Sequence, residues 1–411
     1  MLGLVNRDMA NATVKDIEGI EYLCTGCGAC ATACPTGALM MARDAEGFDQ
    51  PVIDNEKCIT CGVCIKRCQV DNEPNENEPI QVAGCYASDP VARAAGSSGG
   101  VFGLLAGAVQ KQGGVVFGAV YDASTRSVVH KSTEEVDLAR ILRSKYAQSD
   151  ARSCYRDVEA ALKSGRRVLF CGTPCQVAGL SLYLGGMREN LLAIDFFCHG
   201  VPSPGMFSDY VRLKESSRGV PILDVTFREK EHGWREQHMR WYYADGSVEE
   251  EPSLDNCQYF FFLHNYSLRK SCYGCDLYRR HASDVTLADY WLIDEESDDD
   301  LGTSLVLANT RKGEAALASL KDAIVEVSVK GFDMSVYRHG YAVSKREEFF
   351  SVLADAGVGA VCGDYFEKEH ARMARMNRLR NARGALRAAL RGARGLIADV
   401  RGRFGKTGAG R

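Results

Sequence analysis

The chain has 411 residues and a formal net charge of -4, with 45% hydrophobic and 25% charged residues. That length exceeds one compact unit, and the composition is that of an ordinary soluble protein, without a run of about eighteen apolar residues to span a bilayer. The seventeen cysteines are an odd number, and the N-terminus has no secretory leader. These features argue against a disulfide framework, and we expect a cytoplasmic protein.

Two segments near the N-terminus share one cysteine spacing. Residues 24–35 read CTGCGACATACP and residues 58–69 read CITCGVCIKRCQ, with Gln69 where the pattern has Pro. Bacterial ferredoxins with two 4Fe-4S clusters use this spacing, and the fourth cysteine of each segment binds the cluster of the other. Structural zinc sites are the alternative, but they need only cysteine pairs. The predicted ligands are Cys24, Cys27, Cys30 and Cys68 for one cluster, and Cys58, Cys61, Cys64 and Cys34 for the second.

An acidic segment, residues 71–79, has no apolar periodicity and predicts a linker. From residue 80 onward, short apolar segments alternate with glycine-rich turns and helical patterns, which is typical of a mixed α/β domain. We therefore predict a multidomain chain of α/β or α+β class, with a small dicluster ferredoxin domain followed by a mixed α/β domain. The predicted strands are 82–88, 115–122, 168–170, 192–197, 222–230, 239–247 and 284–292, and a helix is predicted over 101–109.

Five cysteines of this second domain fall in or beside predicted loops. Cys272 and Cys275 form one C-x2-C pair, which suits zinc, a redox disulfide or half of a cluster. Cys171, Cys175 and Cys198 follow predicted strands, where α/β sheets usually form their sites. Spacing alone leaves these alternatives open.

A series of motifs in residues 80–310 resembles a known family. The stretches GSSGGVFGLL, SKYAQS, GTPCQVAGL, CHGVPSPG, FREKEHGW, CYGCDL and SDVTLADYW occur in this order. They resemble the family of beta subunits of coenzyme F-420 hydrogenases and dehydrogenases, in which an N-terminal dicluster ferredoxin module is a familiar arrangement. The domains expected from this resemblance are 1–78 (ferredoxin type with linker), 79–160 and 161–362 (N-terminal and C-terminal catalytic regions of the family), and 363–411 (a basic tail).

The resemblance implies an FAD-binding domain that exchanges hydride with a soluble carrier and passes single electrons to iron-sulfur clusters. It also implies a third 4Fe-4S cluster beside the flavin. The matching ligands are Cys175, Cys198, Cys272 and Cys275, with Cys171 as a spare candidate. The alternative is a domain without a third cluster, whose thiols are structural or form a redox pair.

Residues 96–100, GSSGG, precede the predicted helix and would present backbone N-H groups to the FAD pyrophosphate. A serine cap with a flexible glycine turn is the alternative, and only the resemblance favours the phosphate. Lys145 supplies a cation and Tyr146 an aromatic face, although a solvated lysine and a core tyrosine are equally consistent with the sequence. The predicted cofactor-binding residues are Gly96, Ser97, Ser98, Gly99, Gly100, Lys145, Tyr146, Gln148, Gly172, Thr173 and His199.

A second group of residues is a candidate for substrate binding. Arg228, Lys230, Trp234 and Arg235 would grip an anionic, planar substrate, with Asp284 and Asp289 ordering the cleft. Charged strand faces are usually solvated surface, which is the alternative. No catalytic residue can be named from the sequence.

Residues 371–411 contain twelve Lys or Arg and one acid. Helically spaced apolar residues suggest a basic amphipathic helix that touches an anionic inner membrane surface or an acidic partner, and a disordered basic tail is the alternative. Nucleic-acid binding is not expected, because stacking aromatics are nearly absent.

Together these features predict an iron-sulfur flavoprotein oxidoreductase that exchanges hydride with a carrier such as reduced coenzyme F-420. The alternatives are a ferredoxin-fed reductase of an organic substrate, such as an unsaturated or sugar-derived compound, and a non-catalytic electron-transfer subunit of a larger complex. In each case the expected partner is a redox carrier, either deazaflavin or ferredoxin, together with a partner enzyme.

Overall fold

The computed structural model describes residues 23–72, 78–277, 280–329, 332 and 345–380. The chain forms two compact units, Met1–Val358 and Gly359–Arg411. Most of the predicted linker and the part of the basic tail beyond residue 380 lie outside the described residues.

The N-terminal part of the first unit has two short helices and one antiparallel hairpin. Each helix begins directly after a glycine in the left-handed conformation, Gly28 (φ 75°) or Gly62 (φ 70°), where a side chain would be strained. The hairpin pairs Leu39 with Ile53 at one end and Arg43 with Asp49 at the other. The elements are α1 (Ala29–Thr32), β1 (Leu39–Arg43), β2 (Asp49–Ile53) and α2 (Val63–Lys66).

An eight-stranded sheet forms the centre of the first unit, in the order β13-β3-β12-β11-β7-β6-β4-β5. Strands β4, β6, β7 and β11 are parallel neighbours. On one side of them β5 pairs antiparallel with β4, and on the other side β12, β3 and β13 continue the sheet through antiparallel pairings. The strands are β3 (Gln81–Ala87), β4 (Val115–Asp122), β5 (Ser127–Ser132), β6 (Val168–Cys171), β7 (Leu191–Phe196), β11 (Val285–Asp289), β12 (Ser304–Ala308) and β13 (Ile324–Val327).

Both faces of this sheet are covered. Alternate residues of one strand belong to different hydrophobic clusters: Val168 and Phe170 pack on one face, and Leu169 packs on the other. Such strands read as continuous apolar runs, because successive side chains point to opposite faces and each face is buried.

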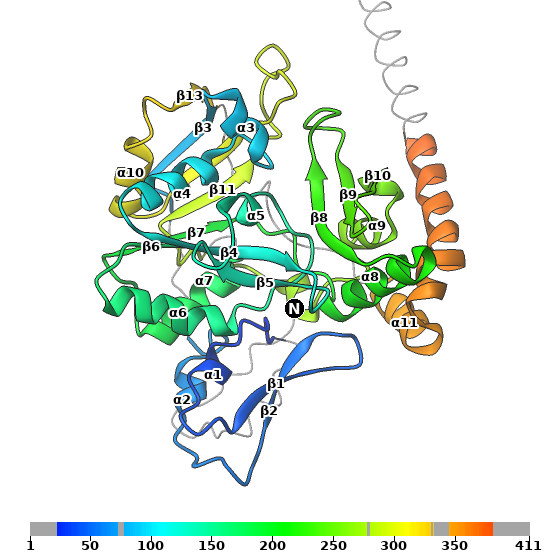
Figure 1. Ribbon diagram of the computed structural model, residues 1–411, viewed down its shortest axis with the longest axis horizontal. Coiled ribbons are helices and arrows are strands. Elements are labelled where there is room, and N and C mark those ends of the chain that lie inside the picture. The colour runs from blue at the N-terminus through cyan, green and yellow to red at the C-terminus, as the bar shows by residue number, and fades with distance from the viewer. Residues whose placement is uncertain (1–22, 73–77, 278–279, 330–331, 333–344, 381–411) are drawn as a thin grey trace, which may run out of the picture. The chain divides into compact units, whose positions relative to one another are not determined.

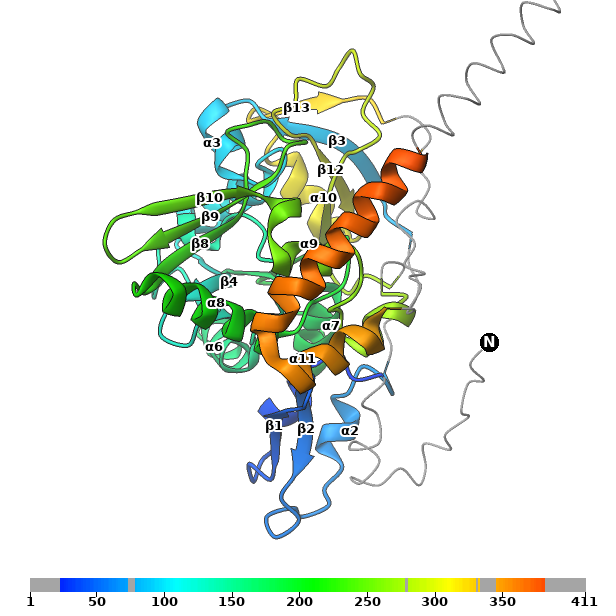
Figure 2. The same cartoon turned by 90° about the vertical axis from the view of Figure 1, so that its right-hand side faces the viewer.

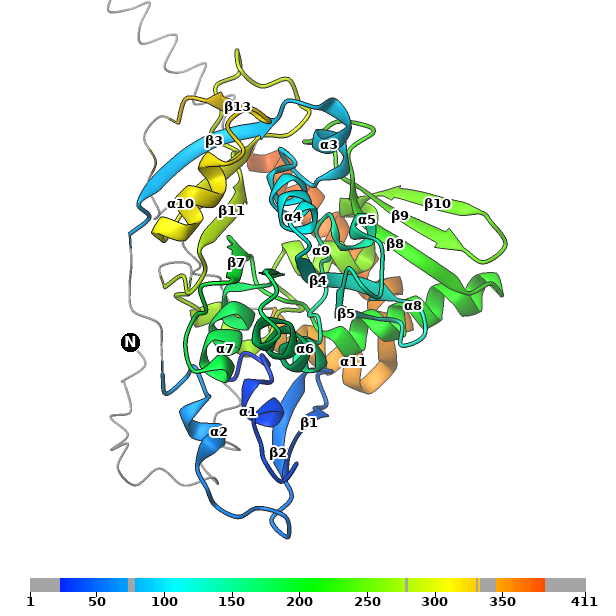
Figure 3. The same ribbon diagram turned by 60° about the vertical axis from the view of Figure 1, so that its left-hand side comes forward.

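Helices α6 (Arg152–Lys163) and α7 (Pro174–Leu184) cover the first face, and α4 (Val101–Lys111) and α10 (Arg311–Ala318) cover the other. Ala29 of α1 is fully buried in the cluster formed by α6, α7 and the sheet. Figure 3 shows α1 and the β1–β2 hairpin directly beneath these two helices. The N-terminal module therefore shares a hydrophobic core with the sheet domain.

A three-stranded antiparallel sheet, in the order β10-β9-β8, stands beside the large sheet (Figure 1). Its β9–β10 hairpin turns through residues 244–247, with Gly246 at φ 80°. The strands are β8 (Ile222–Glu229), β9 (His238–Tyr243) and β10 (Val248–Pro252). The remaining helices of the first unit are α3 (Pro90–Ala95) and α5 (Leu138–Ile141), which contact the large sheet, and α8 (Pro204–Arg218), η3 (Ser253–Asp255), α9 (Cys257–Leu263) and η4 (Lys270–Gly274).

The mixed α/β class is confirmed, and the predicted strands at 82–88, 115–122, 168–170, 192–197, 222–230, 239–247 and 284–292 coincide with β3, β4, β6, β7, β8, β9 and β11 to within a few residues. Strands β1, β2, β5, β10, β12 and β13 were not predicted from the sequence. Strand β12 is buried at all five positions and carries no alternation that would distinguish a strand.

Helix α11 (Arg346–Ala360, Figure 2) continues into a π-helical turn, Val361–Tyr365. Among the described residues, Arg346–Arg380 is long and apolar enough to cross a membrane by length and composition, because one 18-residue window within it has a mean hydropathy of 1.2. The backbone leaves helical geometry at Gly357 (φ 75°, ψ 179°) and at Gly363 (φ -98°, ψ -117°). The stretch is therefore not one regular helix.

Gly313 of α10 offers a test of the packing between helix and sheet. A Cβ at this position would lie 1.9 Å from the carbonyl oxygen of Asp284, which is backbone and cannot move aside. We expect Gly313→Ala to lower the free energy of unfolding by about 2 kcal/mol, as overpacking of a core does. Gly107→Ala in α4 is the matched control, because its Cβ would meet nothing within 4 Å and alanine raises helix stability there. Thermal unfolding followed by circular dichroism measures both; equal melting temperatures would contradict the packing described.

Candidate iron-sulfur and cofactor site

Two cavities of the N-terminal module are each lined by four cysteines. Each contains three cysteines of one repeat and the fourth cysteine of the other repeat, as the spacing predicted. The first cavity is lined by Cys24, Cys27, Cys30 and Cys68, and the second by Cys34, Cys58, Cys61 and Cys64.

The thiols within one cavity influence one another electrostatically. Burial raises the pKa of Cys30 well above its usual value, and Cys27, Cys24 and Cys68 raise it further. Burial also raises the pKa of Cys68 to about 12. Several thiolates in one buried space repel one another unless cations neutralise them. Four such thiolates are the donor set of an iron-sulfur cluster or of a zinc ion.

Gln69, at the position where the repeat has Pro, connects this module to the sheet domain. Its Nε2 donates to the hydroxyl of Thr25 and, at 3.2 Å, to the carbonyl oxygen of Cys175 in α7. A Cβ at Gly179 of the same helix would lie 3.0 Å from the sulfur of Cys27. The first cavity therefore lies against the N-terminal half of α7.

The structure brings four cysteines of the sheet domain together: Cys175 at the start of α7, Cys198 after β7, and Cys272 and Cys275 in and after η4. Burial raises the pKa of Cys175 and Cys275 to about 12 and that of Cys272 to about 11. The pKa of Cys198 is raised well above its usual value by burial and then by Cys272, Cys175 and Cys275. Cys171, whose pKa burial raises to about 12, is influenced by charges outside this group.

Cys175 also links this group to the first cavity, because the pKa of its thiol is raised by both Cys275 and Cys27. The four sheet-domain cysteines and the first set of four are thus immediate neighbours. Helix α7, the hydrogen bond of Gln69 and one buried arginine connect the segments that carry the two groups of cysteines.

That arginine is Arg269, which the sequence analysis did not single out. Its side chain is 1% exposed, and its Nε donates to the carbonyl oxygen of Cys24 at 2.7 Å. Nη1 donates to Oε1 of Gln148 at 3.2 Å, and Nη2 donates to the carbonyl oxygen of Asp49 at 2.7 Å and lies 3.6 Å from the sulfur of Cys24. Its position three residues before Cys272 could have indicated this role, because a buried cation beside metal-binding thiolates adjusts the properties of the metal centre.

The guanidinium of Arg269 acts on both groups of cysteines. It lowers the pKa of Cys175 and Cys272 against the larger effect of burial, and it contacts the sulfur of Cys24 directly. A cation in this position stabilises the more negatively charged state of any metal centre that these thiolates bind.

The carboxyl ends of the parallel strands gather the remaining candidate residues at one edge of the large sheet. Thr173 and Cys175 follow β6, Cys198 and His199 follow β7, and Asp289 ends β11. Open α/β sheets bind their ligands at this edge.

The glycine-rich stretch 96–100 precedes α4 but is packed against its own domain. A Cβ at Gly99 would lie 2.5 Å from the carbonyl oxygen of Cys85, and one at Gly100 (φ 84°) would lie 2.6 Å from that of Ala92. Ser97 Oγ accepts from the backbone N-H of Ser144 at 2.7 Å. Close packing accounts for the glycines, while the N-terminus of α4 has no side-chain cap.

Lys145 and Gln148 have partners elsewhere in the protein. Lys145 Nζ donates to four backbone carbonyls of residues 140–143, among them Ile141 at 3.0 Å, and burial lowers its pKa to about 7. Gln148 Nε2 donates to the carbonyl oxygen of Thr25 at 2.8 Å, so this residue contacts the N-terminal module. Gly172 donates its N-H to Ile194, which ties the two central strands together.

Thr173 caps α7, where its hydroxyl lies 3.0 Å from the sulfur of Cys175. Tyr146 and His199 both contact the ring of Phe262, with centroid separations of 5.1 and 5.0 Å. These contacts place Tyr146, His199 and Cys198 in one aromatic-lined region near the carboxyl edge.

Arg228 of β8 lies in the same region and is 2% exposed. Its Nη1 donates to Asp289 at 2.7 Å, and Trp234 Nε1 donates to the other oxygen of that carboxylate at 3.2 Å. Burial raises the pKa of Tyr146, and Arg228 opposes this rise. Nε and Nη2 of Arg228 have no hydrogen-bond partner among the described residues.

The other predicted substrate residues are distributed differently. Lys230 Nζ donates to the carbonyl oxygens of Arg93 and Ser98, and Arg235 pairs with Asp298 at the surface. Asp284 precedes β11 and therefore lies at the opposite end of that strand from Asp289, where it accepts from the N-H of Ala193. Asp284 cannot order a cleft at the carboxyl edge, so that expectation was wrong.

Comparisons with known proteins identify both parts of the chain. The model for the C terminus of the coenzyme F420 hydrogenase/dehydrogenase beta subunits matches residues 165–330, and that of the 4Fe-4S dicluster domain matches residues 23–72. Residues 165–330 thus match the C-terminal region of the coenzyme F-420 hydrogenase/dehydrogenase beta subunits, and they follow an N-terminal 4Fe-4S dicluster domain.

Two curated relatives match different shares of the chain. The F subunit of the F(420)H(2) dehydrogenase of Methanosarcina mazei is 24% identical over 325 residues, which are 75% of this chain and 85% of that protein. The B subunit of the Na(+)-translocating ferredoxin:NAD(+) oxidoreductase complex of Acetobacterium woodii is 37% identical over 51 residues, 12% of this chain and 14% of that protein.

A solved structure of the F420-reducing NiFe hydrogenase complex of Methanosarcina barkeri, derivatized with xenon, matches with a TM-score of 0.44 and 17% identity. The match covers 66% of this chain and 91% of the other. The family resemblance inferred from the motifs is thus confirmed by the two family models, and the N-terminal module is a 4Fe-4S dicluster domain.

Arg269 provides a test of the electrostatics between the two cysteine groups. Because a nearby cation stabilises the reduced, more negative form of a cluster, Arg269→Gln should lower the midpoint potential of the cluster for which Cys24 is a predicted ligand. The expected decrease is on the order of 60 mV, a tenfold change in a one-electron equilibrium. A redox titration followed by electron paramagnetic resonance measures it.

Arg269→Lys is the matched variant, since it keeps the charge and loses the forked hydrogen bonds. Its potential should lie nearer to that of the wild type than the potential of Arg269→Gln does. Identical potentials for Arg269→Gln and the wild type would contradict a tuning role for this cation.

Proposed function

We propose that the protein is an iron-sulfur flavoprotein oxidoreductase with three 4Fe-4S clusters and one FAD. In this proposal Cys175, Cys198, Cys272 and Cys275 hold the third cluster, next to the one bound by Cys24, Cys27, Cys30 and Cys68. The observation that carries the proposal is the convergence of these four sheet-domain thiols beside the first cavity, reached from three separate loops.

Three features support a cluster in preference to a structural role for these thiols. They come from three separate loops, two of them at strand ends, whereas a redox disulfide needs only one pair. All four thiols are partly buried, and burial raises the pKa of each. The neighbouring Arg269 and the hydroxyl of Thr173 supply a cation and a donor to sulfur.

The residues near the carboxyl edge fit a flavin in part. The buried guanidinium of Arg228 keeps two nitrogens available for an anion or a ring carbonyl, and the uncapped N-terminus of α4 favours phosphate. Tyr146 and His199 offer aromatic and polar contacts, whereas Lys145 and Gln148 have other partners. When bound there, FAD would exchange two electrons with a hydride carrier and single electrons with the clusters.

In this arrangement the protein's own residues hold and insulate the path. Asp289 fixes Arg228, the aromatic side chains around Phe262 exclude water, and Arg269 neutralises the thiolates between two clusters. The carrier that the family relationship favours is reduced coenzyme F-420.

A protein that only relays electrons within a larger complex is the second candidate. It is favoured by the internal partners of Lys145 and Gln148 and by the name of the Methanosarcina mazei relative, which is one subunit of a dehydrogenase.

Iron content distinguishes three clusters from two. Anaerobically purified protein should contain about twelve iron atoms per chain, four for each cluster, and Cys198→Ser should contain about eight. Cys171→Ser is the matched control, because this partly buried thiol ends strand β6 and the charges that influence it lie outside the group of four. The ferredoxin-type electron paramagnetic resonance signals should persist in Cys198→Ser. Eight iron atoms in the wild type would rule out the third cluster.

The electron donor can be found with a panel of reductants. The anaerobic holoprotein is mixed with reduced deazaflavin, reduced pyridine nucleotide or reduced ferredoxin while flavin and cluster absorbance are followed. We expect bleaching by reduced F-420, and a slower reaction in Arg228→Met, which loses the buried cation. Protein with its clusters but without flavin, reduced only by ferredoxin, would instead support the electron-relay role.

A further inference from the structure

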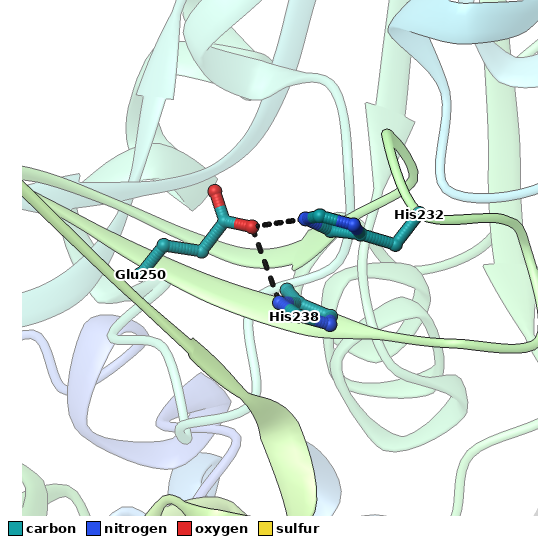
Figure 4. Close-up of side chains that lie close together, drawn as sticks. All are labelled: His232, His238 and Glu250. Atoms are coloured by element: carbon teal, nitrogen blue, oxygen red, sulfur yellow. Dashed lines mark hydrogen bonds and ion pairs between the residues drawn. The ribbon is translucent and has the colours of Figure 1, made fainter.

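We propose that His232, His238 and Glu250 form a binding site for a divalent first-row metal ion such as Zn²⁺, separate from the iron-sulfur centres. His232 lies in the loop between β8 and β9, His238 begins β9, and Glu250 lies in β10 (Figure 4). The proposed electron path does not involve these residues.

The strand register brings the two ligands of the hairpin to one face. Glu250 pairs with Arg240 and Pro252 pairs with His238, so Glu250 and His238 are diagonal neighbours. Because side chains of a strand alternate between faces, positions 238 and 240 share a face with positions 250 and 252. The loop after β8 then returns His232 over this same face.

The three side chains converge on one carboxylate oxygen. Oε1 of Glu250 lies 2.6 Å from Nε2 of His232 and 3.1 Å from Nδ1 of His238. The two imidazole rings are stacked, with centroids 4.1 Å apart and an angle of 25° between planes. One ligand atom from each of the three residues lies within 4.8 Å of the others.

Hydrogen bonding alone leaves one of these side chains unexplained. His238 is 8% exposed, and neither of its ring nitrogens makes a hydrogen bond of acceptable geometry with the described residues, although Glu250 and Glu236 lie within 3.1 and 3.5 Å. A buried imidazole without a hydrogen bond is costly, and a metal ion would provide the missing partner.

The surrounding charges suit a cation that uses Oε1. Arg240 Nε donates to the other oxygen of Glu250, Oε2, at 2.6 Å, and thereby orients the carboxylate. Arg240 is itself paired with Glu231 and Glu229, so carboxylates outnumber guanidinium groups around the site.

Two imidazoles and one carboxylate without a thiolate are the donor set of open zinc sites. Ligand atoms around a tetrahedral zinc are roughly 3.3 Å apart at bond lengths of about 2.0–2.1 Å, so a small rotation of His232 away from Glu250 would open the site. The side chain of His232 is 48% exposed, which provides an entry path. A bound ion would fasten the β8–β9 loop, and with it Lys230 and Trp234, to the hairpin.

The test uses anaerobic holoprotein dialysed first against a chelator and then against micromolar ZnCl₂, with zinc and iron measured by mass spectrometry. We expect about one more zinc per chain in the wild type than in His238→Gln, Glu250→Gln or His232→Gln, with equal iron in all. His264→Gln is the matched control, because His264 lies in a different part of the chain, where Nδ1 contacts the carbonyl oxygen of Phe260.

Thermal unfolding gives a second measurement. Zinc should raise the melting temperature of the wild type and of His264→Gln, and should leave that of His232→Gln unchanged. His232 is largely exposed, so this variant keeps the fold even if the buried His238 proves essential for folding. Equal zinc contents in the wild type and His232→Gln, or equal shifts in melting temperature, would overturn the proposal.

Discussion

The burial of Arg269 between two groups of cysteines is the interaction on which the rest of the site depends. A guanidinium with 1% exposure needs most of its donors satisfied, and it obtains them from Cys24, Asp49 and Gln148. These partners come from the dicluster module and from the segment between β5 and α6. Packing around one cation therefore fixes the module, the sheet and the cysteine loops relative to one another.

The arrangement also explains why the two kinds of structure meet at α7. The helix begins at the carboxyl end of β6 with Cys175, and its buried face forms a core with α6, the sheet and Ala29 of α1. A second contact comes from Arg346, 3% exposed, which pairs with Glu46 in the β1–β2 hairpin. The two cysteine groups therefore meet across packed side chains of one compact unit.

Local patterns in the sequence were sufficient for most of the strands and for the dicluster module. Cysteine spacing predicted which four thiols line each cavity, because chain crossing is set by the repeat itself. The roles of Lys145, Gln148 and Arg269 were not predictable in this way. Lys145 looked like a free cation in the sequence but binds four carbonyls, and Gln148 contacts Thr25, which is far earlier in the chain. The Lys145 contacts are local, to the carbonyls of residues 140–143, and depend on how the backbone turns there, while the long-range hydrogen bond of Gln148 leaves no periodic signal. Strand β12, buried along its whole length, shows no alternation that would identify it.

Gln69 occupies the place where the first repeat has Pro35, and it donates from the dicluster module to the backbone of Cys175. Pro35 has no side-chain donor, so the two halves of the duplicated module are not interchangeable. Together with the fully buried Ala29, this means that one surface of the module is an interface with the sheet domain and is not exposed to solvent. Cut out and grafted onto another enzyme, it would expose that apolar face and lose its docking contact, so it is not a portable electron carrier.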